Sequence, residues 1–297
     1  MKKQFFLMLL ILVIPLSIIA QWAPADNRIT LQGVGAKAIA MNGAFTAIAD
    51  DYSATFWNPA ATSFINCINL GVMHSQMSLN RRMEFLSCTM PISYKNHISF
   101  SWAAFKISEI EARTANSLQP DYIFDNTNYM IWTTYSRRLL KQLSLGLNVK
   151  FFQSQLSNSK AMGGGIDFGL MYNSFKNFRV SFVSQDIGST IKWDTKKKEN
   201  FARVDRFGCS YDVLKKVLLA IDLISRKDKT SVAFGTEIRL SGLMKVRSGM
   251  QESLWSLGTG LTFPIKNRSF VVINYTIKMD SFNEGIFHIF DFNFQQF

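Results

Sequence analysis

The sequence predicts a transmembrane antiparallel β-barrel of about 14 strands, preceded by a partly helical segment. Three observations predict this fold class. The N-terminus carries an apolar run with the features of an export signal. From residue 66 onward, runs of about ten residues alternate apolar and polar side chains. The two long connections between these runs both stand at odd positions in the series, as in barrels that cross a bilayer.

Residues 1–20 have the composition of a secretory signal peptide. Lys2 and Lys3 form a positively charged start, residues 5–19 are apolar, and Ala20 offers a small residue for cleavage. The apolar run is shorter than the ~20 residues that a membrane-spanning helix needs, so export is favoured over an N-terminal membrane anchor. No cysteine follows the cleavage position, and a lipid anchor there is therefore not expected.

Residues 21–64 differ from the rest of the chain in composition and in the spacing of their apolar residues. The stretch 36–51 is rich in alanine, and its larger apolar residues recur at spacings typical of a helix rather than a strand. Asn58 precedes Pro59, which restricts the residue before it to an extended or turn conformation. We therefore expect a compact, partly helical segment in front of an all-β body that comprises residues 65–297.

The all-β body contains about 14 strand-like runs, each near the length that a tilted strand needs to cross a bilayer. They are residues 66–78, 83–92, 97–107, 128–137, 143–156, 161–172, 178–187, 203–211, 217–225, 230–240, 244–250, 254–263, 269–279 and 285–297. In the last run Phe290, Phe292 and Phe294 share one face, and Asp291 and Asn293 share the other. A soluble β-sandwich has the same period, so alternation alone leaves both architectures open.

The lengths of the connections favour the membrane barrel. The long connections, residues 108–127 and 188–202, are the third and seventh in the series, whereas every even-numbered connection is short. Outer-membrane barrels have long extracellular loops and short periplasmic turns. If the N-terminal segment starts in the periplasm, this parity predicts that the short turns lie on the periplasmic side.

Composition and charge indicate a lipid environment. Apolar residues make up 47% of the chain, which includes 26 Phe, and this suits a protein with one face against lipid. A net charge of +12 would point to nucleic acid in a cytosolic protein, but export removes that expectation. The basic residues fall mainly at strand ends and in loops, where they suit solvated rims or contacts with anionic lipid head groups. We predict membrane lipids as partners, and no nucleic acid.

Cysteine and histidine patterns predict no metal or cofactor. Cys67, Cys88 and Cys209 are odd in number and lack the close spacing of a metal site, so we interpret them as isolated apolar thiols on strands. Nothing near His74 or His288 supplies a ligand pair.

The N-terminal segment carries a family resemblance. The stretch GAKAIAMNGAFTAIADDYSATFWNPAATS resembles the start of outer-membrane barrels related to FadL, above all those of the PorV and PorQ type, whose pattern contains Met-Gly-Gly-Ala, Ala-Asp-Asp and Asn-Pro-Ala. The later stretches AMGGGIDFGLMYN, VSFVSQDIGSTIKW and GIFHIFDFNF are also similar to this family. The resemblance covers nearly the whole chain after residue 20.

The resemblance implies a plugged barrel in the outer membrane of a Gram-negative-type, diderm bacterium. Residues 21–64 would fold into the lumen as the plug. The positions that match the motifs of the family are the candidates for holding or gating the plug: Gly43, Asp50, Asp51, Asn58, Pro59 and Ala60. From the residues themselves, Asn-Pro-Ala serves equally well as a rigid turn into the first strand, and both roles stay open.

Three functions follow from these observations, in descending order. FadL-like members carry hydrophobic compounds across the outer membrane, so binding or transport of hydrophobic small molecules comes first. PorV-like members are associated with protein secretion and surface attachment, with secretion proteins or exported cargo as partners. A lipid hydrolase comes last: His97 and Ser99 share a strand face as a base and a nucleophile would, but no third partner is identifiable. We predict that the protein is not an enzyme.

Two departures from the family pattern raise structural questions. Asn42 stands where the family has the first Gly of Met-Gly-Gly, which puts the local backbone turn in question. Phe297 lies on the opposite parity from Phe290, Phe292 and Phe294, and we expect a bulge in the last strand to account for it.

Overall fold

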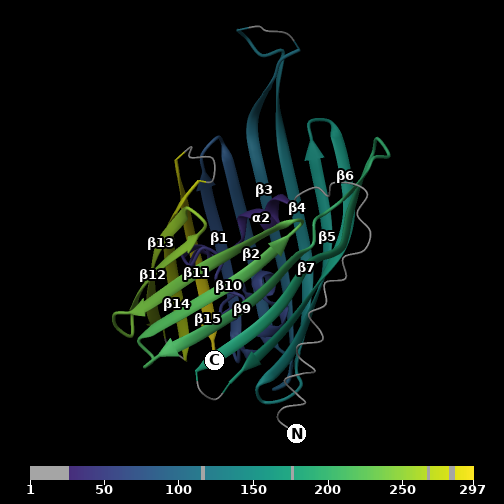
Figure 1. Ribbon diagram of the computed structural model, residues 1–297. Coiled ribbons are helices and arrows are strands. Elements are labelled where there is room, and N and C mark those ends of the chain that lie inside the picture. The colour runs from purple at the N-terminus through teal and green to yellow at the C-terminus, as the bar shows by residue number, and fades with distance from the viewer. Residues whose placement is uncertain (1–26, 115–117, 175–176, 266–267, 281–284) are drawn as a thin grey trace.

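A computed structural model describes residues 27–114, 118–174, 177–265, 268–280 and 285–297 of the chain. The strands form one closed antiparallel barrel (Figure 1). The predicted signal peptide, residues 1–20, lies outside the described residues. Within the described ranges, no helix combines the length and the apolar character needed to cross a membrane.

Short helices precede the strands. They are α2 (Arg28–Gln32), α3 (Ala36–Ala40), α4 (Ala54–Trp57) and the 3₁₀ helix η1 (Pro59–Phe64). The strands are β1 (Ile68–Met77), β2 (Arg81–Pro91), β3 (Asn96–Ala112), β4 (Tyr122–Arg138), β5 (Leu143–Leu156), β6 (Ser159–Asn173), β7 (Phe178–Trp193), β8 (Lys198–Asn200), β9 (Val204–Val213), β10 (Val217–Arg226), β11 (Lys229–Arg239), β12 (Met244–Gln251), β13 (Leu254–Ile265), β14 (Ser269–Met279) and β15 (Ile286–Gln296).

The prediction of an antiparallel barrel of about 14 strands is confirmed. Each strand from β1 to β7 and from β9 to β15 pairs with a neighbour on both sides, and β15 returns to pair with β1, which gives a closed ring of 14 strands. The short strand β8 pairs only with the far end of β7 and stays outside the ring. Closure satisfies the backbone groups of every strand edge, which a strand in lipid requires.

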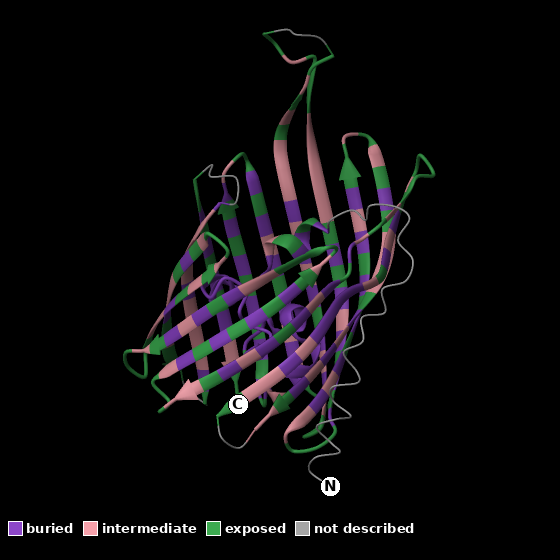
Figure 2. Cartoon of the chain, in the orientation of Figure 1, coloured by how far each residue is buried: buried purple, intermediate pink, exposed green. Residues whose placement is uncertain are grey.

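Buried and exposed positions alternate along most of the strands (Figure 2), and many of the exposed positions carry large apolar side chains. In β15, Phe290 and Phe292 are exposed on the outer surface, whereas Asp291 and Asn293 are buried inside the barrel. The predicted sharing of faces is therefore confirmed, and the soluble sandwich with an apolar interior is wrong for this chain. An apolar exterior with polar residues in the interior is the pattern of a barrel in a bilayer.

Two predicted loops are shorter than expected. The connection predicted at residues 108–127 is largely strand, because β3 continues to Ala112 and β4 begins at Tyr122. The resulting hairpin projects beyond the other strands at the top of Figure 1. The connection predicted at residues 188–202 likewise contains the end of β7 and all of β8. Antiparallel pairing continues past the bilayer because the ladder satisfies the backbone even where the side chains are polar.

The predicted bulge in the last strand is wrong. The pairing of β15 with β14 runs without a register shift from Met279 opposite Ile286 to Ser269 opposite Gln296. Phe297 follows the end of the strand, where its amide donates to the Arg268 carbonyl at 3.3 Å and its ring packs edge-on against Phe270. Phe297 lies beyond the last paired residue of β15, so the alternation along the strand does not determine which way its side chain points.

Candidate functional site

Residues 27–64 occupy the inside of the barrel, and we call this segment the plug (Figure 1). From Gly33 to Ser63 every residue except Asp50 is buried. Inward-facing hydroxyls of the wall bond directly to plug carbonyls: Thr276 donates to Ala36 at 2.7 Å, and Ser256 donates to Ala40 at 2.9 Å. These bonds satisfy carbonyls that very short helices cannot satisfy themselves.

The short helices of the plug begin and end where the sequence supplies the required caps. The Asn27 side chain accepts hydrogen bonds from the amides of Ile29 and Thr30 and caps α2, which ends before Gly33 at a φ of 75°. The first amide of α3, that of Ala36, donates to the Asp291 carboxylate of β15 at 2.7 Å. A carboxylate of the barrel wall therefore takes the place of a side-chain cap in the helix itself.

Glycines in the wall let the plug backbone press directly against the strands. A Cβ atom on Gly146 of β5 would lie 2.2 Å from the carbonyl carbon of Pro59, and one on Gly249 of β12 would lie 2.2 Å from that of Met41. No real Cβ contact is that short, so either site requires glycine unless the plug moves. Further wall glycines leave room for side chains of the plug: Gly71, Gly169, Gly208, Gly235 and Gly258.

The Asn58-Pro59-Ala60 motif forms a rigid turn in the middle of the plug. Asn58 is extended, at a φ of −158°, as a residue before proline must be, and its Oδ1 accepts from the Ala60 amide at 3.0 Å to cap η1. Its Nδ2 donates to the Thr46 carbonyl at 2.8 Å. One buried side chain thus joins two separate stretches of the plug. A gating role for the motif stays a prediction.

Asp50 and Asp51 have different surroundings although they are adjacent. The Asp50 side chain is 45% exposed and forms an ion pair with the buried Lys37 at 2.6 Å. Asp51 is buried, and its Oδ1 accepts from the Ser53 amide at 2.9 Å and from the Ser53 hydroxyl at 2.6 Å. Burial, opposed by the positive charge of Lys37, raises the pKa of Asp51. Asp51 therefore orders the turn into α4, whereas Asp50 balances a charge.

The turn at Asn42 and Gly43 forms although asparagine stands at position 42, where the pattern of FadL-related barrels has a glycine. Asn42 has a φ of 50°, in the left-handed region that asparagine enters more readily than most residues. Its Nδ2 donates to the Leu254 carbonyl of the wall at 2.7 Å, which fixes the turn from outside. Gly43 follows at a φ of 81°, and a Cβ there would approach the Trp57 ring to 3.1 Å.

A charged network that the sequence analysis missed joins the plug to four strands. Lys37 lies 3.8 Å from the Glu237 carboxylate, which accepts from Arg247 Nε at 2.7 Å. Arg247 in turn donates to Asn274 at 2.8 Å, and Asn274 donates to Asp291 at 2.6 Å. Burial alone would lower the pKa of Lys37, but the carboxylates of Asp50 and Glu237 outweigh it, and the pKa is raised. The ammonium of the plug is thus held in its charged form.

A double irregularity in β7 shapes the opposite side of the lumen. The register between β6 and β7 shifts on both sides of Ile166. Within the shifted stretch Asp186 adopts a φ of 58°. A Cβ on Gly163 of β6 would lie 1.8 Å from the Thr190 carbonyl oxygen, so the bulged strand can approach β6 only because glycine stands there.

The bulge directs the Asp186 carboxylate at the plug. Thr30 of α2 donates to it at 2.8 Å, and Asn27 approaches it at 3.4 Å. Lys150 forms ion pairs with both Asp186 and Asp167, the latter at 2.5 Å. All three charged side chains are buried. The first helix of the plug is therefore bound to an ionic cluster of the wall.

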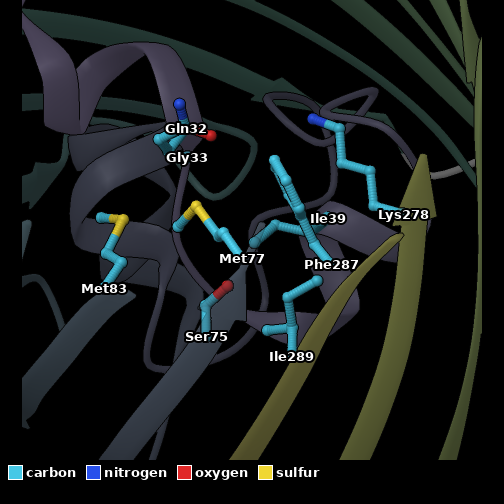
Figure 3. A pocket seen from close by; sticks show the side chains of 9 residues that line it. All are labelled: Gln32, Gly33, Ile39, Ser75, Met77, Met83, Lys278, Phe287 and Ile289. Carbon is cyan, nitrogen blue, oxygen red and sulfur yellow. The ribbon is translucent and has the colours of Figure 1, made fainter. Parts of the chain in front are cut away.

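A small, largely apolar pocket lies between the plug and the wall (Figure 3). The plug contributes Gln32, Gly33 and Ile39 to its lining. The strands contribute Ser75, Met77, Met83, Lys278, Phe287 and Ile289. Its free volume is about 10 Å³, room for about one water molecule, so the surrounding side chains must move before it can hold a larger ligand. Methionine side chains are flexible and adapt to ligands of different shape.

The histidines do not form a catalytic or metal site in this geometry. Ser99 donates its hydrogen bond to Thr89 at 2.9 Å, and among the described residues it makes no hydrogen bond with the buried His97 ring. His74 and His288 lie exposed on the outer surface, the first beside Glu84 at 2.8 Å. Within the described ranges, no group of His, Cys, Asp and Glu could hold a metal ion.

Comparison with known proteins places these features in a family and a fold. The model of an uncharacterised protein family, UPF0164, matches residues 23–205. No curated protein matches the sequence.

Several solved barrels share the fold. The CymD monoaromatic hydrocarbon channel matches with a TM-score of 0.63 at 13% identity, over 92% of this chain and 98% of its own. The toluene transporter TodX of P. putida matches with 0.63 at 12%, over 90% and 99%. A FadL homologue of Pseudomonas aeruginosa matches with 0.57 at 10%, over 92% and 99%. The FadL part of the predicted resemblance is thus confirmed for the fold, and the PorV and PorQ part stays a prediction.

Proposed function

This chain belongs to the uncharacterised protein family UPF0164, and we propose that it binds hydrophobic small molecules and passes them across the outer membrane of a diderm bacterium. The observation that carries the proposal is the largely apolar lining that plug and wall share, with Met77, Phe287 and Ile289 around a small space that must widen to admit a compound. The solved barrels of this fold include proteins described as a monoaromatic hydrocarbon channel and toluene transporters, which supports the same class of ligand here.

The plug sets a requirement for any passage. The wall glycines bring strands and plug into direct backbone contact, so the lumen beside Pro59 and Met41 is filled by the chain itself. A compound in the pocket can therefore continue only if part of the plug changes its conformation. We propose the division into a signal peptide at residues 1–20, a plug at 21–64 and a barrel at 65–297, with plug movement as the step that opens the path.

The candidate gating residues divide by their contacts. Asn58, Pro59 and Ala60 lie against Gly146 and Gly169, where no space remains for local movement. Asp50 and its partner Lys37 lie where the lumen is open to water, because the Asp50 side chain is half exposed. We propose that the ion pair of the half-exposed Asp50 with the buried Lys37 breaks first and that the Asn-Pro-Ala turn moves only with the plug as a body.

A pocket-filling variant tests the proposal. Ile289→Trp places a large ring in the pocket, whereas Phe290→Trp places the same ring on the outer surface of the neighbouring position. Uptake of the fluorescent lipophile N-phenyl-1-naphthylamine is measured in diderm cells that express each variant at equal outer-membrane level. We expect Ile289→Trp to lower the uptake rate several-fold and Phe290→Trp to leave it unchanged. Equal uptake by both variants and by cells without the protein contradicts the proposal.

The secretion role of PorV-type proteins stays a prediction of the sequence resemblance. None of the described contacts favours an exported protein over a small molecule as the ligand of this lumen. Affinity purification from a secretion-active host tests it, and recovery of neither secretion proteins nor cargo counts against that role. Catalysis is likewise not part of the proposal, since Ser99 bonds to Thr89 rather than to His97.

A further inference from the structure

The two rims of the barrel differ in charge. We call the edge formed by the short turns the short-turn rim, and its described turn residues are 92–95, 139–142, 174, 177, 214–216, 240–243 and 268. These turns contain no Asp or Glu, but they carry Lys95, Lys141, Lys215, Lys216 and Arg268, all exposed. The acidic connections, with Asp121, Asp194, Asp228, Glu252 and Asp280, stand at the opposite rim.

The cations of the two rims also differ in their partners. At the long-loop rim basic side chains pair with carboxylates, as Lys106 does with Asp125 at 2.5 Å and Lys197 with Glu199 at 3.1 Å. In the described part of the chain, no ion pair includes a lysine of the short turns. Asp212, the carboxylate nearest to them in sequence, is already bound by Arg239 at 2.7 Å.

Large apolar side chains accompany the lysines of the short-turn rim. Ile92 and Tyr94 precede Lys95 and are 62% and 66% exposed, and Leu214 precedes Lys215 and is 86% exposed. Leu139, Leu140, Leu240 and Leu243 are exposed in the other turns. Exposed large apolar side chains therefore stand among the lysines of this rim. Exposure of such apolar side chains to water is unfavourable, whereas the boundary between lipid tails and head groups accommodates both the apolar and the cationic groups.

We propose that the short-turn rim binds the head groups of anionic phospholipids in the leaflet on its side of the membrane. The unpaired lysines supply the charge that attracts a phosphate, and the adjacent leucine and isoleucine side chains hold the site at the depth of the glycerol region. An acidic soluble protein would meet the same charge but would leave the apolar side chains without a matching surface. The site rests on the barrel lying in a bilayer and is independent of what passes through the lumen.

Barrel stability in defined bilayers tests this proposal. The full chain is placed in nanodiscs of phosphatidylcholine alone or with phosphatidylglycerol, and its thermal midpoint and its retained phosphatidylglycerol are measured. The test variant carries Lys95→Gln, Lys141→Gln, Lys215→Gln and Lys216→Gln. The control variant loses the same charge at the long-loop rim, through Lys160→Gln, Lys192→Gln, Lys196→Gln and Lys198→Gln. All eight lysines are exposed.

We expect phosphatidylglycerol to raise the midpoint of the wild-type protein and of the control variant by several degrees, and to leave the test variant nearly unchanged. Retained phosphatidylglycerol should fall several-fold for the test variant alone, and high salt should remove the difference. Equal behaviour of the two variants overturns the proposal, because net charge would then explain the effect. Heparin that raises the midpoint in phosphatidylcholine as strongly as phosphatidylglycerol does also overturns it, since the rim would then bind soluble polyanions.

Discussion

The Asn58 side-chain amide donates to the Thr46 carbonyl across 2.8 Å, and this bond joins two stretches of the plug that are twelve positions apart. Both groups are buried, so neither can exchange the bond for water. The same side chain caps η1 through its Oδ1. A residue with both a donor and an acceptor is needed here, which explains why asparagine rather than aspartate precedes Pro59.

Asn58→Ala should lower the free energy of unfolding by about 1–3 kcal/mol, because it leaves the buried Thr46 carbonyl without a donor. Urea unfolding in lipid vesicles and hydrogen exchange of the plug amides measure this. Asn158→Ala, at an exposed turn of the barrel, is the control and should be neutral. An Asn58→Ala protein with wild-type stability and unchanged plug exchange would show that the bond contributes nothing.

Gly146→Ala should displace the plug without preventing strand pairing. The added methyl group would lie 2.2 Å from the backbone of Pro59, and overpacking of this kind costs about 1–3 kcal/mol. Trypsin cleavage after Lys37, which is buried in the wild-type protein, reports the displacement. Gly242→Ala is the matched control, because no atom lies within 4 Å of its added Cβ. Equal protection of Lys37 in both variants contradicts the role of the wall glycine.

Glu237→Gln should be far more destabilising than removal of a surface carboxylate. Glu237 is 1% exposed and interacts with both Arg247 and Lys37, so its loss leaves buried cations uncompensated, at a cost of about 3–5 kcal/mol. The exposed pair of Arg203 and Asp205 is the control, and Asp205→Asn should cost about 0–1 kcal/mol. Equal urea midpoints for Glu237→Gln and Asp205→Asn would show that the buried network does not hold the plug.

Asp51→Asn should stabilise the protein in a pH-dependent way. Since burial raises the pKa of Asp51, the folded state favours its protonated form. Below the unfolded pKa of Asp51, about 3.9, the carboxyl group is neutral in both states and does not lower the free energy of unfolding. As pH rises from there to the higher pKa of the folded state, the free energy of unfolding falls, and above that pKa the loss is constant. Asparagine cannot ionise and keeps an acceptor for Ser53. We expect wild type and variant to unfold alike near pH 4 and the variant to be more stable at pH 8, and a constant difference across this range contradicts the shift.

The strand positions were predictable because the side-chain period in a barrel is strict. The run predicted at residues 143–156 coincides with β5, and the run at 269–279 coincides with β14. Lipid on one side and plug on the other keep the alternation clean along each strand. Beyond the bilayer, neither lipid nor plug requires side chains to alternate between apolar and polar. The alternation therefore did not indicate that β3 extends to Ala112.

The contacts of the plug could be predicted only in part. The helix cap by Asn58 follows from local rules, because an asparagine before a proline is a short-range signal. The pairing of Lys37 with Glu237 joins positions two hundred residues apart, and no spacing in the sequence indicates it. The bulge at Asp186 was equally hidden, although a charged residue in the middle of an apolar strand marks such a site in retrospect.

The seam between β1 and β15 sets the order of events in assembly. It pairs Ile68 with Gln296, so the ring can close only after β15 has been made. The plug precedes β1 in the chain and is therefore made before any of the strands that surround it. Pairing of β1 with β15 is thus the step that encloses the plug in the lumen.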